Sequence, residues 1–184
     1  MIFVTVGTQV HFDRLVRAVD EWAVAHGRDD IIAQVGTARY QPRALQTFNF
    51  LDPASFAATQ RDSTLMVAHA GLGSIISALQ IGKPIIIMPR DHRRYEHRNG
   101  HQFTTVEQFR SWPGVYVAMD EAELVALLDR ADELVPGPLE GAEAPIEFIN
   151  QLDTYLRTEH RKSPLRRLLR SLWRRQPSED MIFQ

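Results

Sequence analysis

A glycine-containing turn near the middle of the chain has residue types that suit phosphate binding. The segment 69–74 reads HAGLGS, follows the short apolar run 64–68 and leads into a helix-like stretch without a breaker. Gly71 and Gly73 lack Cβ atoms, so backbone N–H groups there can approach an anion closely. The helix would add the positive end of its dipole, and Ser74 a hydroxyl. The pattern predicts a phosphate-binding turn, with a plain tight turn as the alternative.

A long polar loop follows the next strand-like run, residues 84–88. Arg90 could pair with a phosphate or a carboxylate. The side chains that could exchange hydrogen bonds with sugar hydroxyls are Glu96, Asn99, His101 and Gln102. Because loops at the carboxyl ends of neighbouring parallel strands converge on one crevice, we expect this loop and the glycine turn to face the same ligand.

A second glycine turn is expected near the amino terminus. The strand-like run 1–6 ends at Gly7 and Thr8, and apolar residues then recur on one face of a predicted helix. This turn would lie at the same sheet edge, so the two turns together favour a shared anion site. A general base for an acceptor is expected on a second protein, and His11, close to this turn, is the alternative within the chain.

Strand and helix patterns alternate along most of the chain. The candidate strands are residues 1–6, 31–35, 46–51, 64–68, 84–88 and 115–118. The candidate helices are residues 12–26, 53–60, 73–81, 96–110, 120–133 and 145–158. This alternation predicts an α/β fold with a Rossmann-like, doubly wound parallel sheet. No metal site is expected, because His97 and His101 share a helical face but lack a convincing third ligand.

Composition fits a protein of the cytoplasm. The 184 residues are 44% hydrophobic, include no cysteine and carry a formal net charge of -2. No apolar run approaches the roughly 20 residues needed to cross a bilayer. The start also lacks the basic and then apolar form of a signal peptide.

The end of the chain is predicted to form a basic amphipathic helix. After Ser163 and Pro164, which suit a helix start, leucines and a tryptophan mark one face and arginines the other. We expect this tail, residues 159–184, to attach to an anionic membrane surface or to a partner's helix, and residues 1–158 to form the nucleotide-binding domain. A leucine stripe packed into the core is the alternative. Nucleic acid is not expected as a ligand, because no stacking platform or reader motif accompanies the arginines.

Several of these motifs together resemble a known family. The residues that carry the resemblance are 3–8, 12–15, 69–74, 82–84, 89–90 and 96–102. They look like the donor-binding C-terminal half of a GT-B glycosyltransferase of family 28. Most similar are the PssE-like catalytic subunits of two-part bacterial exopolysaccharide glycosyltransferases, which are similar to the catalytic subunit of the dolichol-linked N-acetylglucosamine transferase.

The resemblance implies positions for the parts of a UDP-sugar. Gly7 and Thr8 would lie near the diphosphate, and Phe50 and Leu51 near the uracil. The residues implied at the phosphates are Gly71, Gly73 and Ser74, and those implied near the sugar are Glu96, Asn99, His101 and Gln102. His69 and His97, which lie within the same motifs, are further candidates for substrate binding. Arg90 would stabilise the departing diphosphate, and the family works without a bound metal or other cofactor.

By this resemblance we expect the catalytic subunit of a two-subunit enzyme at the inner face of the cytoplasmic membrane. It would transfer a hexose or a hexuronic acid, with glucuronic acid as one candidate, to a polyprenyl-diphosphate-linked saccharide in exopolysaccharide or capsule synthesis. A membrane-attached subunit would bind the acceptor. One alternative is a non-catalytic nucleotide-sugar sensor or scaffold. A dinucleotide-dependent oxidoreductase is disfavoured, because the first turn lacks Gly-x-Gly-x-x-Gly and Gln34 and Val35 replace the usual acidic residue.

Overall fold

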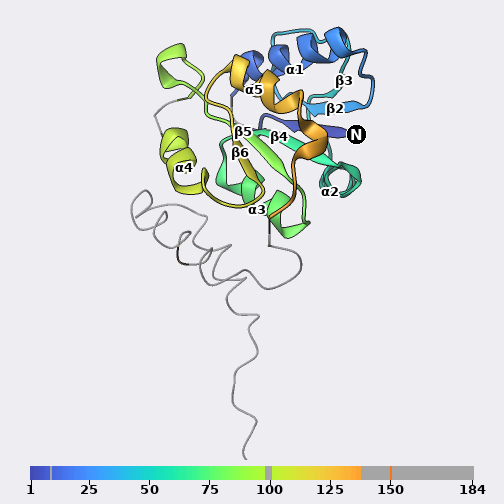
Figure 1. Ribbon diagram of the computed structural model, residues 1–184. Coiled ribbons are helices and arrows are strands. Elements are labelled where there is room, and N and C mark those ends of the chain that lie inside the picture. Colours follow the sequence, from blue (N-terminus) through green and yellow to red (C-terminus); the bar gives the residue numbers. More distant parts are fainter. Residues whose placement is uncertain (9, 98–100, 138–149, 151–184) are drawn as a thin grey trace, which may run out of the picture.

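The computed structural model describes residues 1–8, 10–97, 101–137 and 150. These residues build a six-stranded parallel sheet with the order β3-β2-β1-β4-β5-β6 (Figure 1). The strands are β1 (Ile2–Thr5), β2 (Ile31–Gln34), β3 (Gln46–Phe48), β4 (Leu65–His69), β5 (Ile85–Met88) and β6 (Val115–Val117). The strand order reverses between β1 and β4, and ligands bind at such a switch point in open α/β sheets.

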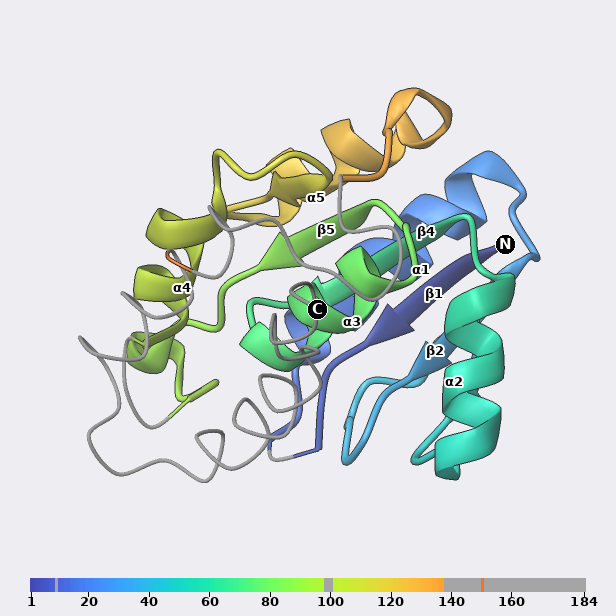
Figure 2. The ribbon, with the colours of Figure 1, turned by 90° about the horizontal axis from the view of Figure 1, so that it is seen from below.

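Helices cover both faces of the sheet. The α-helices are α1 (Asp13–His26), α2 (Pro53–Asp62), α3 (Leu72–Gln80), α4 (His101–Phe109) and α5 (Glu121–Leu128). Two short 3-10 helices are η1 (His92–Arg94) and η2 (Ala131–Glu133). Helices α1 and α5 pack on one face, whereas α2, α3 and α4 pack on the other, the side from which Figure 2 views the molecule.

The two cores explain why the central strands are apolar throughout. Within β1, Ile2 and Val4 pack toward α1 and α5, while Phe3 between them packs toward α3 and α4. Successive strand side chains point to opposite faces, and both faces are buried here. Local signals then set where helices begin and end. Asp52 accepts N–H bonds from Ala54 and Ser55 at the start of α2, and Gly27 ends α1 with a left-handed backbone at φ 61°.

The predicted α/β, Rossmann-like, doubly wound parallel sheet is confirmed, and each of the six expected strands is present within three residues of its predicted limits. The expected helix 96–110 is wrong at its start, because Glu96 and His97 are not helical, and the described part of α4 is His101–Phe109. The expected helix 120–133 is divided into α5 and η2. The expected helix 145–158 and the tail 159–184 lie outside the described residues, except for Asn150. Among the described helices, none combines the length and apolar character that a membrane span requires.

Candidate functional site

The two predicted glycine turns lie side by side at the switch point of the sheet. Strands β1 and β4 are paired in parallel, with Thr5 opposite Ala68, so the chain leaves both strands at the same edge. After β1 the backbone turns at Gly7, whose φ of +75° favours glycine. After β4, Gly71 is the N-cap of α3. The structure therefore brings the first residues of both turns together, as the sequence predicts.

The imidazole of His69 lies between these turns and accounts for two of the glycines. A Cβ atom on Gly7 would lie 2.8 Å from Cε1 of His69, and one on Gly71 would overlap Nε2. Gly7 and Gly71 are thus needed to admit this ring. Gly73 differs, because a Cβ atom there would meet nothing within 4 Å. Of the three glycines, Gly73 is the one that leaves open space at the start of α3.

His69 is held as a neutral imidazole. Burial lowers the pKa of His69 from the ordinary 6.5 to about 4, and the nearby Arg90 cation acts in the same direction. A hydrogen bond with the backbone of Thr5 opposes this shift but does not cancel it. The Nδ1 atom of His69 is buried without a hydrogen-bond partner. His69 is thus a neutral ring, with its Nδ1 atom buried, that separates the backbones of the two turns.

This depressed pKa predicts a dependence of stability on pH. Between pH 6.5 and about 4 the unfolded chain binds a proton at His69 and the folded chain does not, so the free energy of unfolding should fall as the pH drops through this range. The full loss is about 3 kcal/mol. Above pH 6.5 His69 should contribute no pH dependence.

Urea unfolding of the wild type and of His69→Gln between pH 4.5 and 7.5 measures this effect. We expect the acid loss to be smaller in the variant, so that its stability relative to the wild type improves as the pH falls. His92→Gln is the control, because that side chain is 47% exposed. Parallel pH profiles for the wild type and His69→Gln would contradict the neutral, buried state of His69.

Arg90 is directed away from open space, toward the loop that follows β1. Its side chain is buried, and its guanidinium donates hydrogen bonds to the backbone carbonyls of Val6, Val10, His11 and Glu96. It also lies over the ring of Phe12, 4.8 Å from the centroid. Burial lowers the pKa of Arg90 to about 10, opposed by Glu96, so the group stays charged at neutral pH. The expectation of a direct pairing between Arg90 and a phosphate is corrected, because both terminal nitrogens already bind carbonyl oxygens.

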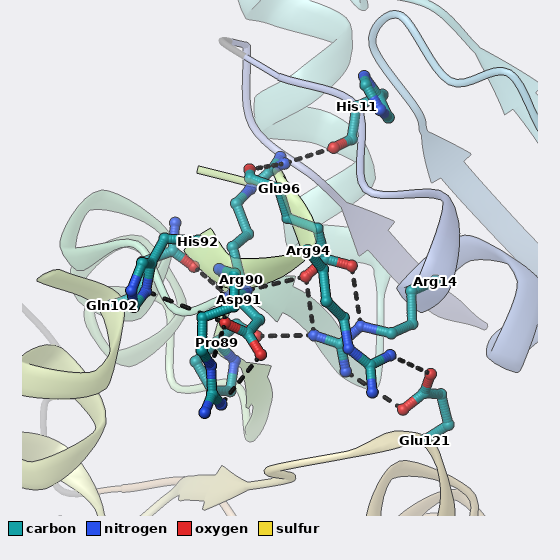
Figure 3. A network of polar contacts seen from close by, with 11 residues as sticks. His11, Arg14, Pro89, Arg90, Asp91, His92, Arg94, Glu96, Gln102 and Glu121 are labelled. Carbon is teal, nitrogen blue, oxygen red and sulfur yellow. Dashed lines mark hydrogen bonds and ion pairs between the residues drawn. The ribbon is translucent and has the colours of Figure 1, made fainter. Parts of the chain in front are cut away.

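Glu96 is likewise engaged within the protein. Its two carboxylate oxygens accept from Nε and Nη2 of Arg14, each at 2.9 Å, and one also accepts from the backbone N–H of Asp91 at 2.8 Å (Figure 3). Arg14 further binds the carbonyl of Pro89 and the carboxylate of Glu121. Burial tends to lower the pKa of Arg14, but its two glutamate partners raise it overall. Glu96, expected beside the sugar, is therefore a partner of Arg14 in this structure.

Gln102 is placed on the same side of the site as Arg90. It is buried in the first turn of α4, next to His101, and its Oε1 atom accepts from the backbone N–H of Arg90 at 2.9 Å. The amide group of Gln102 remains as a donor for a ligand. His97 is half-buried at the end of the preceding loop. Asn99 lies outside the described residues.

The remaining predicted residues line the edge of the sheet. Thr8 and Phe50 are exposed, while His11 and Ser74 are half-buried. Figure 3 shows the ring of His11 pointing away from Arg90, which its carbonyl oxygen contacts. Leu51 is fixed by a hydrogen bond from its N–H to Oε1 of Gln34 at 2.9 Å. Among the described residues, no group of His, Asp and Glu could hold a metal ion.

Two residues with a structural part in the site have no functional signature in the sequence. In the sequence, Gln34 is only a reason to disfavour a dinucleotide site, and Arg14 is only one member of the motif 12–15. The signal for Arg14 is its place immediately after the first turn, where a helix begins. No local signal marks Gln34, because its partner Leu51 is 17 residues away.

The six-stranded doubly wound sheet, with two glycine turns at its switch point and no Gly-x-Gly-x-x-Gly motif, has the Rossmann-like architecture of the donor-binding half of a GT-B glycosyltransferase. The comparison of sequences agrees with this class. The chain matches the glycosyltransferase family 28 C-terminal domain over residues 1–144 and belongs to that family.

Individual relatives are similar to parts of the chain. The UDP-N-acetylglucosamine transferase subunit ALG13 of Mus musculus is 32% identical over 116 residues, which cover 58% of the chain and 10% of that protein. The chain thus spans about a tenth of the length of this relative. The NMR solution structure of ALG13 has a TM-score of 0.53 at 21% identity, covering 75% of this chain and 88% of the other. The crystal structure of the glycotransferase of kitacinnamycin has a TM-score of 0.50 at 16% identity, and the match covers 94% of this chain and 40% of the other. Both solved structures share the fold.

Proposed function

We propose that this protein binds a UDP-sugar and acts as the donor-binding, catalytic subunit of a two-subunit glycosyltransferase. The observation that carries the proposal is the open space at Gly73, next to the neutral His69 and at the switch point of the sheet. Membership of family 28 and the similarity to a protein named as a UDP-N-acetylglucosamine transferase subunit support this nucleotide-sugar donor.

In this proposal the diphosphate binds at the amino end of α3, to the backbone N–H of Gly73 and the hydroxyl of Ser74. The backbone N–H of Ser74 is not part of this set, because it donates to the carbonyl of Gly71 at 3.1 Å. Thr8 and His69 face the same phosphates. The negative charge that develops on the departing diphosphate is stabilised by these donors and by the helix end. Arg90 contributes through its positive charge close by, since its hydrogen bonds are taken by the loop. The uracil lies toward Phe50 and Leu51, and the sugar toward His97, Asn99, His101 and Gln102.

The acceptor side of the reaction belongs to a second, membrane-attached subunit in this proposal. The acceptor is a polyprenyl-diphosphate-linked saccharide of exopolysaccharide or capsule synthesis, and the sugar is a hexose or a hexuronic acid. The general base lies on the second subunit, with His11 as the candidate within this chain. The protein would act at the inner face of the cytoplasmic membrane. Residues 159–184 would attach it there, to anionic lipid or to the partner.

A donor screen tests the proposal. Calorimetry with UDP, several UDP-sugars and NAD should show binding of UDP and of one class of UDP-sugar, and none of NAD. Transfer to a lipid-linked acceptor in the presence of the partner then separates an enzyme from a sensor or scaffold. A chain that binds NAD and not UDP would overturn the proposal.

A charge-altering substitution at Gln102 should separate sugar recognition from nucleotide binding. Gln102→Glu keeps an acceptor for the N–H of Arg90 and removes the amide donor that we place beside the sugar. Losing one hydrogen bond costs roughly 0.5 to 1.5 kcal/mol. We therefore expect the affinity for UDP-sugar, relative to that for UDP, to fall by about 2- to 12-fold.

Calorimetry should compare the affinity for UDP-sugar with the affinity for UDP. The ratio of the two is the informative result, because the added negative charge weakens the binding of both ligands. Gln108→Glu, later in α4, is the matched control for a charge placed on the same helix. Equal losses for UDP and UDP-sugar would place Gln102 away from the sugar.

A further inference from the structure

We propose that Arg14, Arg90 and Glu96, together called the brace, hold the loop after β1 in its ligand-binding position. Within the brace, Arg14 and Glu96 are positioning residues rather than ligands. The nucleotide part of this inference rests on the proposed function. The geometric part stands on the contacts of the free protein.

The first half of the brace is the guanidinium of Arg90. It comes from the end of β5 and donates to three carbonyls of the loop between β1 and α1, those of Val6, Val10 and His11. Backbone carbonyls buried without a donor are costly, so one cation here satisfies three groups of a segment that belongs to no helix or strand. The shape of this loop, which carries Gly7, Thr8 and His11, therefore depends on where Arg90 lies.

The second half is the pair of Arg14 and Glu96, which fixes the loop that carries Arg90. Both side chains are only 11% exposed and meet in a two-pronged pair with both N–O distances at 2.9 Å. Arg14 also donates to the carbonyl of Pro89, so one guanidinium holds the start and the end of the loop 89–96. The backbone carbonyl of Glu96 in turn accepts a hydrogen bond from Nη1 of Arg90 at 3.2 Å. The three residues form one connected network, through the carboxylate and the backbone carbonyl of Glu96 (Figure 3).

The position of the brace in the sheet gives it a functional consequence. Strand β4 lies between β1 and β5, so contacts that join the loops after β1 and β5 pass over the end of β4. That end carries His69 and leads to Gly71 and Gly73. The brace therefore ties together the two loops that flank the predicted phosphate site. Small displacements of groups that contact a ligand reduce binding and turnover strongly, so loosening the brace should act on the nucleotide site without removing any ligand contact.

The test compares two arginines that make the same kind of ion pair at opposite edges of the sheet. Arg14→Met removes the guanidinium and keeps an apolar stem of similar length. Arg28→Met is the matched control, because Arg28 forms a two-pronged pair with Asp30, at 2.7 and 3.0 Å, just before β2. Arg14→Lys keeps the charge without the two-pronged geometry. Hydrogen exchange of the backbone amides and calorimetry with UDP and UDP-sugar are measured on the full chain.

We expect Arg14→Met to weaken the binding of UDP and of UDP-sugar by the same factor of about ten. Faster hydrogen exchange should be confined to residues 7–16 and 89–97. The affinities and exchange rates of Arg14→Lys should lie between those of Arg14→Met and the wild type. Arg28→Met should have wild-type affinities and wild-type exchange rates at the site. Glu96→Gln should also affect both ligands equally. Wild-type exchange and affinity in Arg14→Met would overturn the brace, and so would a loss specific to UDP-sugar in Glu96→Gln. If the wild type binds no UDP, the proposed function fails, while the exchange result still decides whether the brace exists.

Discussion

Gly73→Val is expected to abolish UDP binding while the domain stays folded. Gly73 lies in the first turn of α3, and an added side chain would enter the open space where we place the diphosphate. A branched side chain there blocks the approach of the phosphate to the backbone N–H groups. The loss should exceed about 100-fold in affinity, or about 3 kcal/mol. Valine is no worse than glycine in a helix, so thermal stability should not fall.

Calorimetry with UDP and a thermal melt together test this expectation. Gln80→Val is the matched control, because Gln80 is an exposed residue at the far end of the same helix. It introduces the same side chain into α3 and should bind UDP normally. A folded Gly73→Val protein with wild-type affinity for UDP would show that the diphosphate does not bind at this turn.

The purified chain is expected to bind UDP-sugar but to transfer almost no sugar to a lipid-linked acceptor until a second subunit is added. The described residues build one Rossmann-like sheet with its helices, and in our proposal this sheet supplies only the donor wall of the cleft that closes around donor and acceptor. Addition of the acceptor-binding subunit should raise the rate to that of an ordinary enzyme. An ordinary rate from the chain alone would contradict the two-subunit proposal.

Removal of residues 160–184 extends this experiment to the predicted tail. UDP binding should persist, because the strands and loops of the site precede the cut. Attachment to anionic vesicles or to the partner should be lost, and with it the transfer to a lipid acceptor. Vesicle attachment of the full chain should weaken with salt, since exposed charges are screened over about 8 Å at physiological ionic strength. Vesicles of neutral lipid are the control.

The sequence alone determined most of the elements of this protein and the sheet edge at which its two glycine turns lie. The run 64–68, the HAGLGS segment and the helix after it were predictable because strand and helix periods, and the effects of glycine, act between near neighbours in the chain. The parallel direction of the strands then follows from the alternation of these elements. The meeting of the Gly7 and Gly71 turns at one sheet edge was therefore predictable from local pattern.

Only the tertiary structure decided which partner each buried polar side chain takes. Arg90 and Glu96 have residue types suited to a phosphate and a sugar, yet Arg90 binds carbonyls up to 84 positions away and Glu96 binds Arg14, 82 positions away. His69 similarly fits between Gly7 and Gly71 through packing of two turns from different strands. A charged group that is buried on folding needs a partner, and the fold determines which partner is within reach. A local sequence pattern contains no information on the distance between residues so far apart in the chain.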